Sequence, residues 1–364
     1  MKMHVAFTFC MIVFSGLSVM GKTFIPADNG AIQYFGRFDF SNQKEVAFDW
    51  PGVYIKCEFE GRSCSVVLQG RSCYDAFVDG KFVKMIVVEG PKETFLLTDQ
   101  LNKGKHSLSI VKRSESGTEA SVFYGLVLDE GCKVIASKSQ TKRKIEFIGD
   151  SYTAGFASES ISRECSAKDC DFIIFLSTNT GKAFGPQIAS VFNADYQINA
   201  ISGKGLVRNY NGIDKGKEFP AYYDKVLISK VNRGEQSPLW NFKSWHPDVI
   251  VIGIGINDFQ ADPPYADSAK FDSTYFNLVK SLKSQHSGVK VICCATRIWP
   301  NSTLIPRVKN VVDELKKNGD TSTYYFEFET ENTALYGHPS VKDHQKIASE
   351  LEKLISSITG WKKN

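Results

Sequence analysis

The chain has 364 residues, more than one hydrophobic core usually serves, so two domains are expected before any motif is considered. Its content of 42% apolar and 12% aromatic residues is that of an ordinary globular protein with full cores. The formal net charge of +4 is spread along the chain without basic runs, which argues against nucleic acid as a partner.

Residues 1–21 have the pattern of a signal peptide. Lys2 precedes an apolar stretch that runs from Val5 to Met20 and ends among small residues, so we expect cleavage near Gly21. A membrane anchor is the alternative, but about 20 apolar residues are needed to span a bilayer and this stretch is shorter. No later segment is suited to span a membrane. The sequence therefore predicts a secreted or periplasmic protein.

Residues 23–135 alternate short β-type runs with turn signals and show no helical period. The strongest turn signal is the segment 78–81, Val-Asp-Gly-Lys, because Asp-Gly supplies the positive φ angles that a two-residue hairpin requires. We therefore predict an all-β sandwich, jelly-roll-like, over residues 23–135. The polar, basic stretch 136–143 is predicted to be a linker to a second domain.

Residues 144–364 have a different rhythm, in which apolar strands are separated by long helical patterns. The predicted strands are 144–148, 194–198, 249–254, 290–295 and 324–328. Strands that alternate with helices predict a three-layer α/β domain with a five-stranded parallel sheet. Such sheets place ligands at the carboxyl ends of their strands, so chemistry is sought there.

The nine cysteines become eight once Cys10 leaves with the signal peptide, too few for a disulfide-rich scaffold. Their spacing matches no zinc template, and the sequence implies neither a metal nor another cofactor. Cys165 and Cys170 flank a short polar loop and are the best disulfide candidates, although the sequence leaves their pairing open. Cys293 and Cys294 lie in an apolar run and are interpreted as buried free thiols.

Ser151 follows the first strand of this domain, in the segment FIGDSYTAG, where a helix is about to begin. A serine in such a turn has its hydroxyl near backbone N–H donors. The segment is not the Gly-x-Ser-x-Gly elbow of α/β-hydrolases, because Asp150 precedes the serine and Thr153 replaces the second glycine. The alternative is an ordinary turn with a helix-capping serine.

Two neighbouring strand ends carry further hydrogen-bond donors. Gly203 and Gly205 follow the second strand, where they let the backbone approach a ligand or else only shape a loop. Asn257 follows the third strand in GIGINDF and can aim its amide across the sheet, although Asn-Asp is also a common turn. A serine, a glycine N–H and an asparagine amide suit acyl transfer, because fixed donors must hold the tetrahedral oxyanion.

A serine nucleophile also needs a base, for which histidine is the natural candidate. Residues Ser340 to Asp343 form a capping box that begins the last helix, which leaves His338 in the preceding loop, free to reach Ser151. His344 is expected on the first turn of that helix, where it packs or caps. The other histidines lie in the signal segment, in the β domain, before the third strand or in a polar loop.

These four segments and their order resemble the SGNH (GDSL-type) hydrolase superfamily. The resemblance implies that Ser151 is the nucleophile, that Gly203 and Asn257 complete the oxyanion hole, and that His338 is the base. A β-sandwich ahead of such a domain, with GRFDF, DGKFVKMI and SGKGLVRN in these places, is similar to carbohydrate esterase family 2. That likeness implies an acetyl xylan esterase-like enzyme that removes acetyl groups from acetylated polysaccharides such as xylan and glucomannan, or from acetylated sugars.

SGNH enzymes usually have an aspartate three residues before the catalytic histidine, and Leu335 occupies that position here. The resemblance to family 2 members with a Ser-His dyad implies an imidazole oriented by a backbone carbonyl. Asp343 is the alternative acid, but a capping role is favoured for a first-turn carboxylate. Asp150 and Asp258 are predicted to hydrogen-bond the catalytic loops into shape.

Sugar binding uses aromatic faces, and Trp299, after the fourth strand, is the predicted substrate-binding residue, with core packing as its alternative. Tyr210, Trp240 and Trp245 are weaker candidates. Two other functions stay open at this point: an SGNH lipase or thioesterase that prefers longer acyl chains, and a carbohydrate-binding protein whose hydrolase domain is inactive.

Overall fold

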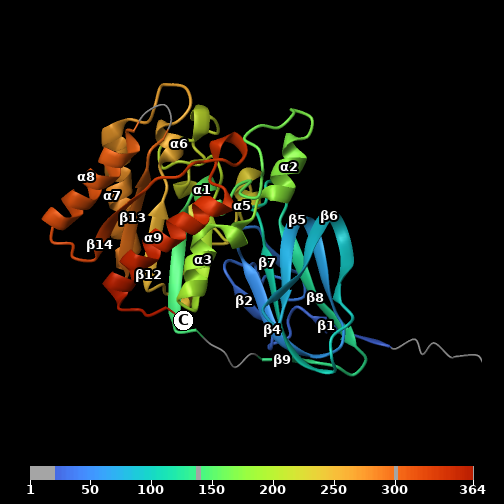
Figure 1. Ribbon diagram of the computed structural model, residues 1–364. Coiled ribbons are helices and arrows are strands. Elements are labelled where there is room, and N and C mark those ends of the chain that lie inside the picture. The colour runs from blue at the N-terminus through green and yellow to red at the C-terminus, as the bar shows by residue number, and fades with distance from the viewer. Residues whose placement is uncertain (1–20, 137–140, 299–301, 364) are drawn as a thin grey trace, which may run out of the picture.

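A computed structural model describes residues 21–136, 141–298 and 302–363, so nearly all of the predicted signal peptide lies outside the described residues. Two sheets organise the molecule (Figure 1). The first is antiparallel and contains β1 (Lys22–Pro26), β2 (Gln33–Phe35), β3 (Val46–Phe48), β4 (Tyr54–Gly61), β5 (Cys64–Val78), β6 (Lys81–Thr98), β7 (Gly104–Lys112), β8 (Ser121–Asp129) and β9 (Val134–Ile135).

The long strand β5 folds this sheet over on itself. Its residues 64–69 pair with β8 and its residues 74–78 pair with β7, while β6 follows β5 along nearly its whole length. The turn from β5 to β6 is the predicted Asp79-Gly80 hairpin, with φ angles of 51° and 73°. The predicted all-β domain is confirmed as a nearly closed antiparallel sheet around an apolar core.

The second sheet is parallel and has the strand order β11-β10-β12-β13-β14. Its members are β10 (Arg143–Gly149), β11 (Ala194–Ala200), β12 (Val249–Gly253), β13 (Lys290–Thr296) and β14 (Thr323–Phe328). The apolar strands β12 and β13 are almost wholly buried because helices cover both faces of the sheet. The predicted five-stranded parallel sheet is therefore confirmed.

Helices α3 and α9 pack together on one face of the sheet, and α7 and α8 pack together on the other (Figure 1). The α-helices are α1 (Ser151–Ala154), α2 (Cys170–Ser177), α3 (Phe184–Val191), α4 (Pro220–Tyr223), α5 (Ile228–Asn232), α6 (Ile256–Phe259), α7 (Ser268–Gln285), α8 (Leu304–Lys317) and α9 (Val341–Thr359). Short 3-10 helices are η1 (Thr180–Lys182), η2 (Tyr210–Gly212), η3 (Phe242–Ser244) and η4 (Leu335–Gly337). Among the described residues, none of these helices is long and apolar enough to cross a membrane.

The start of α9 is the predicted capping box. The hydroxyl of Ser340 accepts from the N–H of Asp343, and the Asp343 carboxylate accepts from the N–H of Ser340. His344 lies on the first turn of the helix, where it is fully buried and stacks on Phe184, with 6.0 Å between ring centroids. Of the two roles left open for His344, packing is therefore the one observed.

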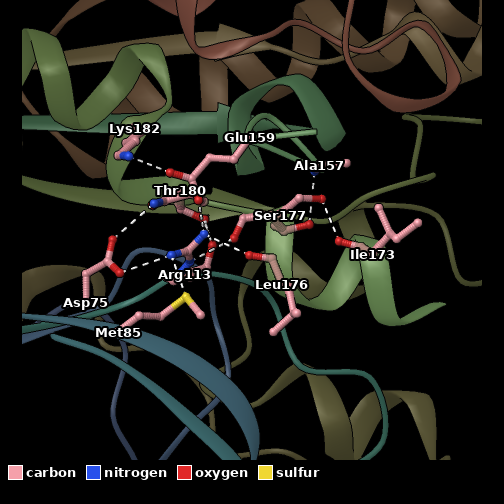
Figure 2. Close-up of polar contacts among 12 residues, drawn as sticks. Asp75, Met85, Arg113, Ala157, Glu159, Ile173, Leu176, Ser177, Thr180 and Lys182 are labelled. Atoms are coloured by element: carbon pink, nitrogen blue, oxygen red, sulfur yellow. Dashed lines mark hydrogen bonds and ion pairs between the residues drawn. The ribbon is translucent and has the colours of Figure 1, made fainter. Parts of the chain in front are cut away.

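Arg113, just after β7, joins the two domains (Figure 2). Its guanidinium donates to the carboxylates of Asp75 (3.1 Å) and Glu159 and to two main-chain carbonyls at the end of α2. The main-chain carbonyl of Arg113 accepts from the N–H of Thr180 (2.7 Å), whose hydroxyl lies 2.6 Å from the carbonyl of Ala154 in α1. The β domain thus supports the helix that begins at Ser151.

A second buried arginine, Arg37, reaches from the β domain to the carbonyls of Tyr223 and Lys225. Its guanidinium carbon lies 4.9 Å from the ring centroid of Trp50 and 5.3 Å from that of Trp240. The buried apolar side chains of both domains form one continuous cluster around these contacts. The domain boundaries at 23–135, 136–143 and 144–364 stay predictions, and residues 137–140 lie outside the described residues.

Candidate active site

Ser151 and His338 meet at the carboxyl edge of the parallel sheet. Ser151 is the first residue of α1, directly after β10, and its Oγ lies 2.9 Å from Nε2 of His338. The other ring nitrogen, Nδ1, lies 3.0 Å from the carbonyl oxygen of Leu335. Because a carbonyl only accepts, we assign the proton to Nδ1, and Nε2 keeps its lone pair toward the serine hydroxyl. Nε2 of His338 can therefore take the proton of the Ser151 hydroxyl.

Burial lowers the pKa of His338 to about 4, and the hydrogen bond to the Leu335 carbonyl offsets this shift only in part. The aromatic ring of Phe156 lies 4.6 Å from the imidazole, and that of Tyr152 lies 5.7 Å from it, centroid to centroid. The imidazole is therefore neutral at neutral pH, the form in which it accepts a proton.

The carboxylate of Asp343 is engaged in the capping of α9. It accepts from the N–H and the hydroxyl of Ser340, at 2.9 and 2.8 Å, and from the N–H of Glu331 at 2.8 Å. Burial would raise the pKa of Asp343, but these N–H donors hold it below its usual value. Asp343 has the capping role that the sequence favoured, and the imidazole of His338 is bonded to a main-chain carbonyl in its place.

Gly203 and Asn257 line the same cavity as Ser151 and His338, and this cavity has a volume of about 600 Å³. One Nδ2 hydrogen of Asn257 is donated to the carbonyl of Lys204 (2.9 Å), which fixes the direction of the amide. An amide nitrogen carries two hydrogens, and with no second acceptor among the described residues, one remains for a ligand. The structure thus brings all four predicted catalytic residues together around one cavity.

Asp258 ties the loop after β11 to α6, as predicted. Its two carboxylate oxygens accept from the N–H groups of residues 206, 207 and 208 at 2.9, 2.8 and 3.0 Å. Asp150 accepts from the N–H of Tyr152 (3.1 Å) and so caps α1. Burial is the largest influence on both carboxyls and raises the pKa of each to about 7.

Comparison with known proteins agrees with this geometry. Residues 34–137 match the family model described as carbohydrate esterase 2 N-terminal, and residues 145–351 match that of the GDSL-like lipase/acylhydrolase. An acetylxylan esterase / glucomannan deacetylase of Cellvibrio japonicus is 33% identical over 84% of this chain and 83% of its own length. The chain belongs to carbohydrate esterase family 2.

The cellulase/esterase CelE of Acetivibrio thermocellus is 31% identical over 92% of the chain, which spans only 40% of the length of CelE. A solved structure of a family two carbohydrate esterase from Clostridium thermocellum, in complex with cellohexaose, superposes with a TM-score of 0.81. It is 30% identical, and the match covers 91% of this chain and 99% of that one. These likenesses place this family 2 chain among the carboxylic ester hydrolases.

The candidate aromatic residues of this family 2 esterase lie at different places in the fold. Trp299, the predicted substrate-binding residue, lies outside the described residues. Tyr210 does line the cavity, whereas Trp240 packs on the guanidinium of Arg37 and Trp245 lies within 5.9 Å of the Lys144 ammonium. Sequence reasoning missed other lining residues: Phe156, Ser202, Gln260 and Tyr336.

Tyr336 is 57% exposed at the rim of the cavity and has a φ of 55°. Its N–H donates to the carbonyl of Arg163 (2.9 Å), and its phenolic oxygen lies 3.0 Å from Sγ of Cys170. Cys170 is disulfide-bonded to Cys165, the pair that the sequence favoured. Tyr336 could have been suspected because it lies two residues before His338 in LYGHPS. The local sequence of a loop, however, does not determine the direction in which a side chain points.

The adjacent cysteines of β13 do not line this cavity. Cys293 and Cys294 are free and buried in β13, as predicted. Within residues 21–136, 141–298 and 302–363, no group of three or more His, Cys, Asp or Glu side chains could hold a metal ion. The cavity around Ser151 is accordingly the candidate site for the family reaction.

Proposed function

We propose that this chain is a secreted carbohydrate O-acetyl esterase that works through a Ser151–His338 dyad. The observation that carries the proposal is the continuous chain of hydrogen bonds from Ser151 Oγ through the imidazole of His338 to the carbonyl of Leu335. The carbonyl accepts a hydrogen bond from Nδ1–H and so holds the ring in the tautomer that a general base requires.

In the first half-reaction, Nε2 of His338 takes the proton of Ser151 as Oγ attacks the acetyl carbonyl carbon. The negative charge that develops on the carbonyl oxygen is stabilised by the N–H of Gly203 and the free Nδ2 hydrogen of Asn257. The imidazolium then gives its proton to the departing sugar oxygen, which leaves acetyl-Ser151.

In the second half-reaction, His338 takes a proton from water, whose oxygen attacks the acetyl carbon of the acyl-enzyme. The same two donors hold the second oxyanion. Collapse of that intermediate returns the proton from His338 to Ser151 Oγ and releases acetic acid, which ionises to acetate in water. The Leu335 carbonyl stabilises the imidazolium in both steps by accepting from Nδ1, the role that a carboxylate has in a triad.

The proposed substrates are acetylated plant polysaccharides of the xylan and glucomannan type, or acetylated sugars. The relatives named acetylxylan esterase / glucomannan deacetylase support this choice. Tyr210 and Tyr336 also support it, because they are 45% and 57% exposed on the cavity rim, where sugar rings can stack on them. Secretion is supported by the signal-peptide pattern of residues 1–21 and by the disulfide Cys165–Cys170.

Acetate release from acetylated xylan and glucomannan tests the activity, with nitrophenyl acetate and nitrophenyl octanoate as a pair that reports acyl length. We expect acetate release and a preference for the acetyl ester, both lost in Ser151→Ala while its circular dichroism spectrum stays that of the wild type. Much faster cleavage of the octanoyl ester would indicate a lipase or thioesterase instead. Polysaccharide binding that survives Ser151→Ala, without turnover by the wild type, would indicate a binding protein.

Secretion is tested separately by N-terminal sequencing of the exported protein. Cleavage near Gly21 is expected. Retention of residues 1–20 in a membrane fraction would contradict it and favour the anchor.

A further inference from the structure

The β domain reaches the active site through the segment that follows β7. Glu115 in this segment lines two cavities, of about 430 and 340 Å³, that flank the catalytic one. Phe156 lines the first of these together with the catalytic cavity, and Ser202 lines the second together with the catalytic cavity. Phe156 and Ser202 therefore separate Glu115 from the catalytic cavity, and Glu115 lies directly behind them.

One carboxylate oxygen of Glu115 accepts from the main-chain N–H of Ser202 at 3.0 Å. The other oxygen is buried and has no hydrogen-bond partner among the described residues. A carboxylate makes a stronger hydrogen bond to an N–H than a neutral acceptor does. The β domain thus supplies a strong, directed contact to the residue immediately before Gly203.

Residues 201–204 form a tight turn in which the N–H of Lys204 donates to the carbonyl of Ile201 (3.3 Å). Gly203 is its third residue and has a φ of +77°, the conformation that a type II turn requires at this place. Glycine adopts positive and negative φ with similar ease, so its own backbone does not fix the direction of its N–H. Contacts from outside the turn must do so.

Two such contacts are present on either side of the Ser202–Gly203 peptide. The carbonyl of Gly203 accepts from the N–H of Tyr210 (2.8 Å), and the N–H of Ser202 donates to Glu115 (3.0 Å). The first comes from the catalytic domain, and the second comes from the β domain. Removing Glu115 would take away the contact nearest the Gly203 N–H on the Ser202 side, and the next one on that side is the bond from the Ile201 N–H to the Gly149 carbonyl (3.2 Å).

We propose that Glu115 is a positioning residue of the esterase reaction, which holds the turn 201–204 so that Gly203 meets the oxyanion. The inference rests on the proposed function, because it assigns Gly203 to the oxyanion hole. Loss of a whole donor costs about a hundred- to a thousand-fold in rate, and misplacing one costs less. The N-terminal domain is then a part of the catalytic machinery, acting through Gly203.

The test compares Glu115→Ala, Glu115→Gln and Glu119→Ala in the full chain, by steady-state kinetics on nitrophenyl acetate. Glu119 is an exposed glutamate of the same loop and is the matched control. We expect Glu115→Ala to lower kcat by about ten- to a hundred-fold with KM within about twofold. Glu115→Gln keeps an acceptor oxygen and should restore kcat to within about threefold of the wild type.

Hydrogen–deuterium exchange of the peptide containing residues 201–204 provides a readout that is independent of catalysis. Glu115→Ala should accelerate exchange there, whereas Glu119→Ala should not. Equal kcat for Glu115→Ala and Glu119→Ala overturns the proposal, and so does unchanged exchange. If the wild type hydrolysed no ester, the proposed function would fail, and the exchange experiment would still decide whether Glu115 holds the turn.

Discussion

Polar side chains at the carboxyl edge of the parallel sheet face a cavity, whereas those at the junction of the two domains are enclosed by protein. At the edge, His338 bonds Ser151 and Leu335, and Asn257 keeps an N–H available. At the junction, Arg113 is 4% exposed and donates to Asp75, Glu159 and main-chain carbonyls (Figure 2).

The difference lies in what completes the hydrogen bonds of each buried group. A polar group enclosed by protein needs protein partners, because an unpaired buried donor or acceptor costs about 1–3 kcal/mol. A group that faces a cavity can leave one hydrogen bond to a substrate. Substitutions at the edge should therefore lower activity more than stability, and substitutions at the junction should lower stability first.

His338→Ala is expected to have the largest effect on activity and little effect on stability. Loss of a general base lowers kcat by about a hundred- to ten-thousand-fold. The variant leaves no enclosed group unpaired, because Ser151 borders the cavity and the Leu335 carbonyl still accepts from the main-chain N–H of residue 338 (3.2 Å). Steady-state kinetics and a thermal melt measure the two quantities. A large drop in melting temperature would contradict the expectation that substitutions at the edge lower activity more than stability.

Arg113→Ala is expected to destabilise the fold by about 3–5 kcal/mol, because it leaves the buried carboxylate of Asp75 without its cation, whereas Glu159 keeps Lys182. The ion pairs with Asp75 and Glu159 are the ones lost. Urea unfolding measures the change. Arg113→Lys is the matched variant, since it keeps the charge but not the forked geometry, and it should be intermediate. An Arg113→Ala variant as stable as the wild type would contradict the structural role of the junction.

The edge was largely predictable from sequence and the junction was not, for a physical reason. The hairpin at 78–81 and the capping box at Ser340 depend on residues within four positions of one another, so local chemistry determines them. Ser151, Gly203 and Asn257 each follow a strand, and parallel strands bring their carboxyl ends to one edge. The absence of a triad acid was likewise predictable, because Leu335 occupies the position at which SGNH enzymes usually have an aspartate.

The contacts of Arg113 with the catalytic domain, and that of Glu115 with Ser202, instead join residues 46 to 87 positions apart in different domains. The contact of Arg113 with Asp75 spans 38 positions within the β domain. No periodicity or spacing in the sequence links them, since domain docking decides which surfaces meet. His286 shows the same limit on a smaller scale. It follows α7 in a loop, as expected, yet its ring is only 2% exposed and lies 5.1 Å from that of His246.

The pH dependence of kcat/KM tests whether the edge is as enclosed as the pKa of His338 indicates. Nε2 must be unprotonated to accept a proton, so activity is present above the pKa of about 4 and falls about tenfold per pH unit below it. An imidazole at its ordinary value of 6.5 would put this acid limb more than two units higher. A limb near 6.5 would show that water solvates the ring.

The same lowered pKa has a consequence for stability. A histidine whose pKa falls on folding binds a proton more readily in the unfolded chain, so its contribution is present above pH 6.5 and is lost as pH falls toward 4. His338→Ala should therefore lose stability less steeply over this window than the wild type does. Urea unfolding at several pH values checks this.

Asp343→Asn is expected to have the smallest effect on both activity and stability. It tests whether Asp343 belongs to the catalytic edge or to the groups enclosed by protein. Among the described residues, Asp343 accepts from Ser340 and Glu331, so we expect a loss of about 1 kcal/mol from weaker capping and a kcat within about twofold of the wild type. If its carboxylate were the acid of a triad, kcat would fall by about ten-thousand-fold. Unfolding and kinetics on the same preparation separate the two. Because the Leu335 carbonyl already occupies Nδ1 of His338, Asp343 belongs with Arg113, among the groups whose partners are all protein.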